Sequence, residues 1–142
     1  MSTFPRPGHA TDDEHFIRTI PVDFARYYEA RDVDQLATLF SDDGRVLAPF
    51  RPVGQGRMGL RDTFKTSFVQ YDPKDLKLVT IFVEVCGHVA YGYGTYSMNI
   101  KLPNGTRVDD RGKWLACLRR VTSWKMVAQC WNSDLPLSAF MS

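Results

Sequence analysis

The spacing of apolar residues after residue 11 predicts a long helix. Apolar side chains recur every three or four positions, as one face of a helix requires: Ile17, Ile20, Phe24 and Tyr27 or Tyr28. Thr11 and Glu14 form a capping box, in which the hydroxyl and the carboxylate satisfy free backbone amides. Pro21 lies inside the run and cannot donate to the carbonyl of Ile17. We therefore expect a kink or break near Ile20.

Two more helices and a short strand are predicted before residue 70. Asp32 is placed to cap a second helix, which the Asp42-Asp43-Gly44 turn ends. A short strand is expected over Arg45–Phe50, followed by a loop rich in proline and glycine. The third helix should run from Met58 to about Val69, with its apolar face directed inward.

The second half of the chain reads as four long strands, bounded by turn residues: Lys77–Val85, Val89–Leu102, Arg107–Arg120 and Trp124–Ser133. Helices followed by a meander of strands are typical of an α+β domain. We predict a strongly curved, cone-shaped antiparallel sheet with the N-terminal helices packed on its concave face. Residues 11–136 would form this single domain, between a flexible arm (1–10) and a C-terminal tail (137–142).

The Asn104-Gly105 pair predicts a tight hairpin and sets the expected strand register. Asn-Gly favours a two-residue type I′ turn, which would pair Pro103 with Thr106. The inward-facing pairs would then be Asn99 with Asp110, Thr95 with Trp114, Tyr93 with Ala116, and Tyr91 with Leu118. A bulge near Gly92 or Gly94 would invert part of this assignment.

Composition excludes several classes of protein. The 44% hydrophobic content against 24% charged residues predicts a packed core, and 18 basic against 16 acidic residues is too balanced for a nucleic-acid binder. The three cysteines are widely spaced and the histidines show no ligand spacing, so we expect free thiols and no metal site. The sequence shows neither a signal peptide nor a membrane span, so we expect a cytoplasmic protein. We also expect no cofactor.

The order of elements resembles the nuclear transport factor 2-like superfamily, which includes ketosteroid isomerase-like and SnoaL-like proteins. The resemblance covers about Asp12 to Asp134. Its most specific segments are Glu29–Asp32 running into Leu36–Gly44, Gly56-Arg57, Asp110–Trp114, and Trp124–Val127 leading to Trp131–Asp134. These segments are turns and core positions, so they indicate the fold more than an activity.

The chain departs from the steroid isomerases of this superfamily at three positions. The resemblance places Ala48 where the catalytic base would stand, Phe24 at the position of the tyrosine, and Ala116 near that of the protonated acid. Neither alanine nor phenylalanine can abstract a proton or donate a strong hydrogen bond. If the protein is an enzyme, we expect a cofactor-independent isomerase, lyase or hydrolase, and not a ketosteroid isomerase.

The interior of such a cone would be aromatic. The predicted ligand-binding residues are Phe24, Tyr28, Phe64, Tyr91, Tyr93, Trp114, Gln129 and Trp131. Aromatic walls suit a small apolar or aromatic ligand, although the same rings would also serve as core. Asp110 is the one carboxylate expected on the inner face, where burial would raise its pKa and suit it to acid–base work. A structural partnership with Asn99 or an arginine is its alternative role.

Two functions fit these features. The first is a SnoaL-like homodimer that binds a small, mostly apolar ligand, with Asp110 as a candidate catalytic residue. The second is a non-catalytic dimerisation or binding module whose cavity is filled by its own side chains. The homodimer is expected through the outer sheet face, on which the predicted register places these apolar residues: Tyr96, Met98, Ile100, Leu115 and Cys117.

Overall fold

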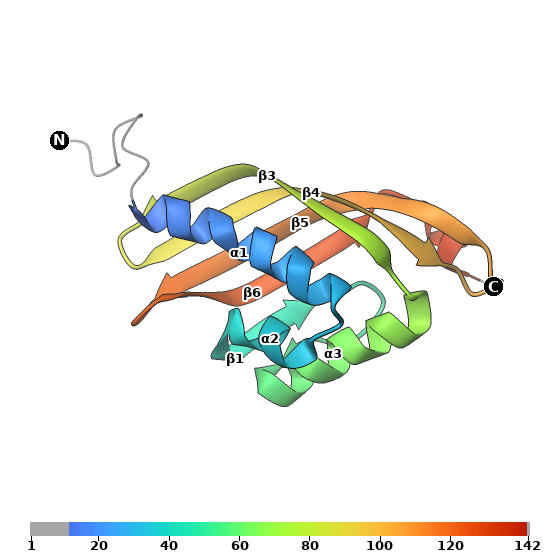
Figure 1. Ribbon diagram of the computed structural model, residues 1–142, viewed down its shortest axis with the longest axis horizontal. Helices are drawn as coiled ribbons and strands as arrows, with labels where there is room; N and C mark the ends of the chain where they lie inside the picture. Colours follow the sequence, from blue (N-terminus) through green and yellow to red (C-terminus); the bar gives the residue numbers. More distant parts are fainter. Residues whose placement is uncertain (1–11, 142) are drawn as a thin grey trace.

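The computed structural model describes residues 12–141, which form three α-helices and a six-stranded sheet (Figure 1). The helices are α1 (Asp12–Glu29), α2 (Val33–Thr38) and α3 (Gly56–Tyr71). The strands are β1 (Phe40–Leu47), β2 (Gly54–Gln55), β3 (Lys74–Cys86), β4 (Val89–Lys101), β5 (Arg107–Arg120) and β6 (Trp124–Ser133). A short 3₁₀ helix, η1 (Leu137–Phe140), follows the last strand. The predicted α+β class is confirmed.

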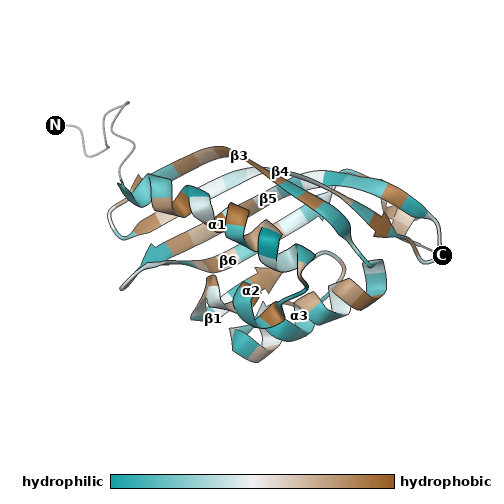
Figure 2. Cartoon of the chain, viewed as in Figure 1, coloured by the Kyte–Doolittle hydropathy of each residue, from teal (hydrophilic) through white to brown (hydrophobic). Residues whose placement is uncertain are grey.

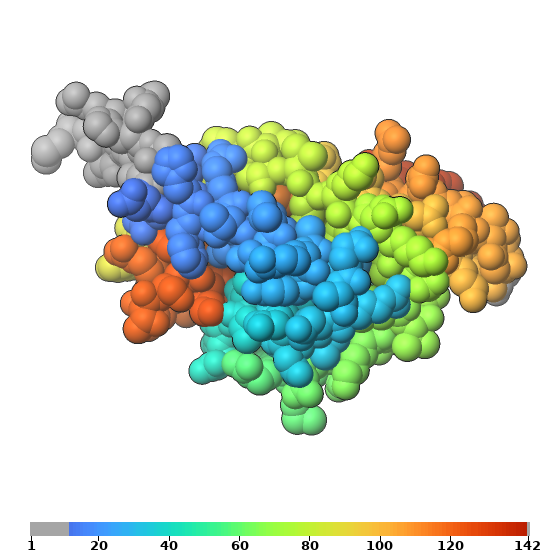
Figure 3. Space-filling view, viewed as in Figure 1, coloured from blue at the N-terminus to red at the C-terminus, as the bar shows by residue number. Residues whose placement is uncertain are grey.

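Strands β3 to β6 form an antiparallel meander, and β1 lies beside β6 in parallel orientation. The strand order is β2-β1-β6-β5-β4-β3. The helices pack on one face of this sheet, which we call the inner face. In the space-filling view they occupy the centre of that side of the molecule (Figure 3). The chain therefore places its helical first half over its strand-rich second half, as the order of elements predicts.

Helix α1 runs unbroken through Pro21, so the predicted break near Ile20 is wrong. Four buried side chains on one face hold the helix against the sheet and offset the missing hydrogen bond: Ile17, Ile20, Phe24 and Tyr28. The carboxylate of Asp13 anchors its first turn, since it accepts a 2.9 Å hydrogen bond from the indole of Trp124. The predicted cap Thr11 and the predicted arm, residues 1–10, lie outside the described residues.

The boundaries of the shorter elements differ most from the prediction near β1, the segment predicted as a loop contains the short strand β2, and α3 is about two residues longer than predicted at each end. Asp32 caps α2 as expected, because its side chain accepts a 3.1 Å hydrogen bond from the amide of Gln35. The Asp42-Asp43-Gly44 segment, however, belongs to β1, which begins at Phe40. A register shift between Phe40 and Arg45 absorbs these turn-forming residues within the strand.

The hairpin between β4 and β5 closes through three residues instead of two. The amide of Leu102 donates to the carbonyl of Thr106, and Gly105 takes a φ of +86° inside the loop. Pairing therefore runs from Lys101 with Arg107 to Val89 with Arg119. This register is one residue away from the predicted one, and a one-residue slip turns every side chain of a strand to the opposite face. The inward residues of β4 are consequently the even-numbered ones.

Two glycines in this strand pair accommodate aromatic rings from the strand opposite. Gly94 pairs with Trp114, and Gly112 pairs with Tyr96. A Cβ atom on Gly112 would lie 2.6 Å from the Tyr96 ring, and one on Gly94 would lie 2.9 Å from the Trp114 ring. Each ring thus lies over a position that has no side chain. The indole of Trp114 also donates a 3.1 Å hydrogen bond to the carbonyl of Thr95, which fixes its orientation.

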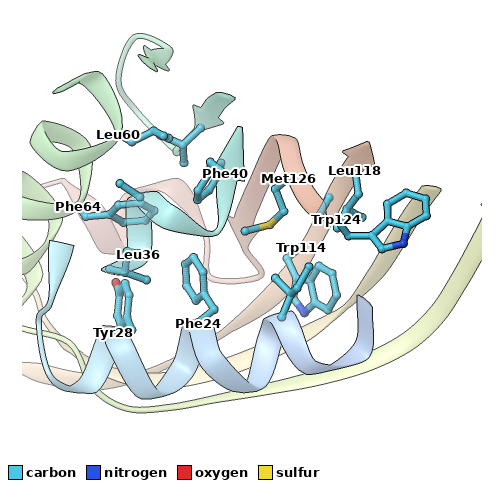
Figure 4. Close-up of a cluster of buried hydrophobic side chains, with 14 of the residues drawn as sticks. Phe24, Tyr28, Leu36, Phe40, Leu60, Phe64, Trp114, Leu118, Trp124 and Met126 are labelled. Carbon is cyan, nitrogen blue, oxygen red and sulfur yellow. The ribbon is translucent and has the colours of Figure 1, made fainter. Parts of the chain in front are cut away.

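The core lies between the helices and the inner sheet face (Figure 4). Phe24 and Tyr28 rise from α1, and Phe24 meets Phe64 of α3 edge-on at a centroid distance of 5.8 Å. Apolar segments recur on α1 and along β3 to β6, between polar ones (Figure 2). The resulting packing ties α1 and α3 to each other as well as to the sheet.

The outer sheet face carries a different apolar set from the predicted one. Tyr96, Met98 and Ile100 point inward, so their predicted place on the outer face is wrong. One row of cross-strand neighbours spans five strands of that face: Leu47, Cys130, Leu115, Tyr93 and Phe82. Within residues 12–141, no helix combines the length and the apolar character needed to cross a membrane.

We predict that Gly94→Ala destabilises the fold strongly. The new Cβ would overlap the carbonyl oxygen of Val79, which is backbone, and would lie 2.9 Å from the Trp114 ring, so the β3 backbone or the indole would have to shift. The free energy of unfolding, measured in urea, should fall by about 3 kcal/mol, the upper end of the usual cost of overpacking. The exposed neighbour Thr95→Ala should change it by less than about 0.5 kcal/mol. A loss below about 1 kcal/mol for Gly94→Ala would contradict this close packing.

Candidate functional site

The larger hollow lies between α1 and the centre of the sheet. Its empty volume is about 750 Å³, part of it open to solvent. Helix α1 contributes Ile20, Pro21 and Phe24, and the sheet contributes Trp114 and Trp131 among other apolar side chains. We call it the apolar cavity. Such a lining favours ligands with a flat apolar body, because aromatic and aliphatic walls gain most by excluding water from such surfaces.

A smaller, more polar hollow adjoins it. We call this the Asp110 pocket; its empty volume is about 450 Å³, including solvent-open space. Its polar groups include Asp110, Ser133, Tyr71 and Arg51. The two hollows share four lining residues, which form the wall between them: Tyr28, Tyr96, Met98 and Trp131. A carboxylate and an apolar binding space therefore lie on either side of one layer of side chains.

Asp110 is held by two hydroxyl groups and is almost fully buried. Its side chain accepts a 3.1 Å hydrogen bond from the hydroxyl of Tyr96 and a short one from the hydroxyl of Ser133, and the residue is 3% exposed. Burial raises the pKa of Asp110, and the nearby charge of Asp134 acts in the same direction. The two hydrogen bonds favour the charged form but do not outweigh burial. The carboxyl group is thus tuned to exchange a proton at higher pH than an ordinary aspartate.

The neighbouring tyrosines remain neutral phenols. Burial raises the pKa of Tyr96 and of Tyr28, and the charge of Asp110 raises both further. The Tyr71 pKa is also raised, mainly by burial. Neutral phenols act as hydrogen-bond donors: Tyr96 donates to Asp110, and the hydroxyl groups of Tyr28 and Tyr71 can donate to a polar group of a ligand.

Gln129 is a polar residue that lines the apolar cavity. It lies on the inner face of β6, opposite Ala116 of β5, and is 8% exposed. Its Oε1 atom is the one buried side-chain nitrogen or oxygen among residues 12–141 that has no hydrogen-bond partner. An unsatisfied buried acceptor costs free energy, commonly about 1–3 kcal/mol. One residue that lines the cavity therefore has an acceptor atom that no other group of the protein satisfies.

The structure brings five of the eight predicted ligand-binding residues to the apolar cavity. They are Phe24, Tyr28, Trp114, Gln129 and Trp131. Asp110 faces inward as predicted, in the adjoining pocket. Phe64 is fully buried and packs between Phe24 and Phe40, so its predicted place on the cavity wall is wrong.

The predicted inward positions of Tyr91 and Tyr93 are also wrong. Both are on the outer face, 39% and 42% exposed, where their rings pack beside Phe82. The error arose from the length of the loop after Leu102. A two-residue turn was predicted, whereas the observed loop has three residues, which shifts the register of β4 against β5 by one. Inner positions of β4 are filled by Gly92, Gly94 and Tyr96 instead.

Two residues of the site were missed by sequence reasoning. Tyr96 was placed on the outer face, and Ser133 was not singled out at all. The glycines at 94 and 112 were the available signal, since an aromatic residue commonly packs over a glycine on the neighbouring strand. Nothing in the sequence near Ser133 indicates that it would meet Asp110, which is 23 residues away.

The alternative partners expected for Asp110 are not the observed ones. Asn99 bonds to Asp109 and Arg107, not to Asp110. The neighbouring carboxylate of Asp134 forms a 2.5 Å ion pair with Lys113. Asp110 consequently has no cationic partner among the described residues and keeps only its two hydroxyl donors.

The C-terminal segment covers the Asp110 pocket. Phe140 of η1 lines this pocket and packs against Phe50 and Tyr71, at centroid distances of 5.3 and 6.2 Å. Phe50 has a φ of +62°, a strained value for a bulky residue. The aromatic contact thus limits the access of water to Asp110, which contributes to its desolvation.

No three histidine, cysteine, aspartate or glutamate side chains of residues 12–141 are placed to hold a metal ion together. All three cysteines are free. The polar groups that line the two hollows are carboxyl, phenol, hydroxyl, amide and guanidinium groups.

Solved structures with the same arrangement come from several bacteria. A ketosteroid isomerase-like protein from Erwinia carotovora atroseptica superposes with a TM-score of 0.80 at 17% identity, over 89% of this chain and 99% of that one. A nuclear transport factor 2-like protein with a cystatin-like fold from Novosphingobium aromaticivorans gives 0.70 at 16% identity, over 92% and 90%. The chain has the nuclear transport factor 2-like fold.

Other structural neighbours with this fold are similarly distant in sequence. A suggested dehydratase of the nuclear transport factor 2-like family from Streptomyces avermitilis gives a TM-score of 0.71 at 16% identity, over 87% of this chain and 98% of that one. No protein-family model matches the sequence, and no curated protein matches it either. The predicted resemblance in fold is confirmed, while identities this low carry no information on activity.

We predict that Asp110→Asn raises the melting temperature at neutral pH and that this gain disappears in acid. A carboxyl group whose folded-state pKa is raised stabilises the fold fully only below its unfolded pKa of about 3.9 and loses that contribution as the pH rises through its folded pKa. Asparagine avoids the buried charge, so the variant and the wild type should converge near pH 4.

Calorimetry from pH 4 to pH 8 would measure this difference, with the exposed neighbour Asp109→Asn as the matched control. If Asp110→Asn instead melts lower than the wild type across the whole range, the carboxylate is a structural acceptor for Tyr96 and Ser133.

Proposed function

We propose that this protein binds a small, mostly apolar molecule in the apolar cavity, and that Asp110 exchanges a proton with it through the hydroxyl group of Tyr96, which lies in the wall between the two hollows. The observation that carries the proposal is the adjacency of an unfilled apolar hollow and a buried carboxyl of raised pKa across the Tyr28–Tyr96 wall. A pocket of this lining with a perturbed titratable group beside it is the usual form of a small-molecule site.

The chemistry available at the wall is proton transfer. Asp110 can accept the proton of the Tyr96 hydroxyl as that phenol takes one from the ligand, and can return it, while the neutral phenol of Tyr28 can hold a ligand oxygen by a hydrogen bond. An isomerase, lyase or hydrolase reaction needs no more than such groups. Among proteins of the same fold are one isomerase-like protein and one suggested dehydratase, whose reactions would be of this class.

Ketosteroid isomerisation itself is not the proposed reaction. Phe24 and Ala116 line the apolar cavity and Ala48 lines the Asp110 pocket, and none of these side chains can carry a proton. A Δ5-3-ketosteroid therefore serves as a negative control. The pure protein should isomerise it no faster than buffer alone does.

The outer sheet face favours a second proposal, a homodimer formed through it. Seven large apolar side chains exposed by 39–56% gather there: Leu47, Val79, Ile81, Phe82, Tyr91, Tyr93 and Leu115. Monomeric soluble proteins rarely leave so many apolar neighbours in contact with water. The cross-strand row through Leu115 and Tyr93 would lie at the centre of a two-fold interface.

The cavity proposal predicts that filling the space abolishes binding. Ala116→Leu adds three carbons to the cavity floor and should weaken binding of a two-ring probe such as naphthalene at least about tenfold, because the ligand's apolar surface can no longer be buried. NMR titration would measure the affinity. Ala30→Leu, at an exposed position beyond α1, is the matched control.

Native mass spectrometry of freshly purified protein would complement the titration by detecting any retained small molecule. Wild-type protein that binds no apolar probe and retains no molecule would count against the proposal and in favour of a module whose cavity has no ligand.

The dimer proposal predicts a mass of twice the 16.2 kDa chain in light scattering at micromolar concentration. Leu115→Glu, which places a charge in the centre of the apolar row, should yield monomer with unchanged circular dichroism. Val22→Glu, at an isolated exposed position on α1, should remain dimeric. A wild-type mass of one chain would rule out the interface.

A further inference from the structure

The floor of the apolar cavity contains a row whose two central residues are unusually small. Cross-strand pairing places Val83, Gly92, Ala116 and Gln129 side by side across four strands of the inner face, and all four line the cavity. Gly92 and Ala116, at the centre, contribute no side chain and one methyl group. We call this row the trough. It is a depression in the sheet surface with Val83 toward one end and Gln129 toward the other.

Larger side chains stand on both sides of the trough. The next row on one side contains Trp114 and Trp131, which pair directly across β5 and β6. On the other side, Leu118 pairs with Met126. All four line the apolar cavity, which α1 covers. The space is therefore a slot with aromatic and aliphatic walls, whose long direction crosses the strands.

The length of the slot suits two fused rings. Val83 on β3 and Gln129 on β6 are three strand spacings apart, or ~14 Å between backbones at about 4.8 Å per spacing. Their side chains take up part of that length. What remains over Gly92 and Ala116 accommodates a flat bicyclic body between the two walls.

At the Gln129 end of the slot, a buried acceptor atom has no hydrogen-bond donor. Oε1 of Gln129 is buried and unpaired, and it can only accept. The Tyr96 hydroxyl is already committed to Asp110. A water molecule would be a poor substitute, because a buried water needs two to four polar partners and the surrounding walls are apolar.

We propose that the trough binds a flat two-ring molecule whose hydroxyl group donates a hydrogen bond to Oε1 of Gln129. This inference rests on the proposed binding function and narrows its ligand class to hydroxylated bicyclic molecules. The rings lie over Gly92 and Ala116, the tryptophan wall covers one edge, and Gln129 fixes which end of the ligand points toward β6.

Three probes with the same two-ring body test the hydrogen bond: naphthalene, 2-naphthol and 2-methoxynaphthalene. The first offers no polar group, the second can donate, and the third can only accept. The three tryptophans of the chain give three indole signals in proton–nitrogen NMR. Trp114 and Trp131 line the cavity and should shift on binding, whereas Trp124, whose indole bonds to Asp13 outside it, should not.

We expect 2-naphthol to bind about fivefold to tenfold tighter than either other probe, the usual gain from one hydrogen bond in a buried site. In Gln129→Met, which keeps the length of the side chain but removes the acceptor, that preference for 2-naphthol should vanish. Gln55→Met, an exposed position on β2, should retain the wild-type preference.

The outcomes separate this inference from the proposed function. Equal affinity for all three probes, or a preference for 2-naphthol that survives in Gln129→Met, overturns the role of Gln129 but leaves the cavity as a binding site. Tighter binding of 2-methoxynaphthalene than of 2-naphthol overturns the donor requirement. Failure of every probe to move Trp114 and Trp131 rejects the binding function itself. If Gln129→Met does not fold, the affinities of the three probes for the wild-type protein still test whether a donor is required.

Discussion

The register between β4 and β5 is the constraint on which the rest of the structure depends. The three-residue loop at Pro103–Gly105 sets it, and the pairs Gly94–Trp114 and Gly112–Tyr96 lock it. Each ring needs the space that the opposite glycine leaves, so a slip by one residue would drive both rings into side chains. This one register also directs Tyr96 to Asp110 and opens the trough at Gly92 and Ala116.

The site depends on a balance between burial and hydrogen bonding. Two hydroxyl groups hold Asp110 without a cation, so burial prevails and the pKa of the carboxyl is raised. An arginine in contact would have reversed the sign. Gln129 is the opposite case, a buried group with no partner for its acceptor atom. Both polar groups adjoin apolar space, where a single ligand hydrogen bond changes the free energy more than it would in water.

The alternation of side chains along the strands gives the two sheet faces separate roles. Even-numbered residues of β4 and β5 build the core and the cavity, while odd-numbered residues such as Tyr93 and Leu115 form the apolar outer row. A ligand inside and a second copy outside would therefore bind to neighbouring residues of the same strands.

The sequence by itself determined the α+β class, most element boundaries, the Asp32 cap and the inward face of β5 with Asp110 and Trp114, because these follow from local periodicity and capping chemistry. It also indicated Gln129, but not its unpaired atom. The continuity of α1 through Pro21, the inward position of Tyr96, the core position of Phe64 and the contact of Ser133 with Asp110 were decided only by tertiary structure. One physical reason is that a loop one residue longer than predicted reverses the faces of a strand. The other is that packing against distant strands outweighs local preferences. The spacing of neighbouring residues in the sequence reveals neither effect.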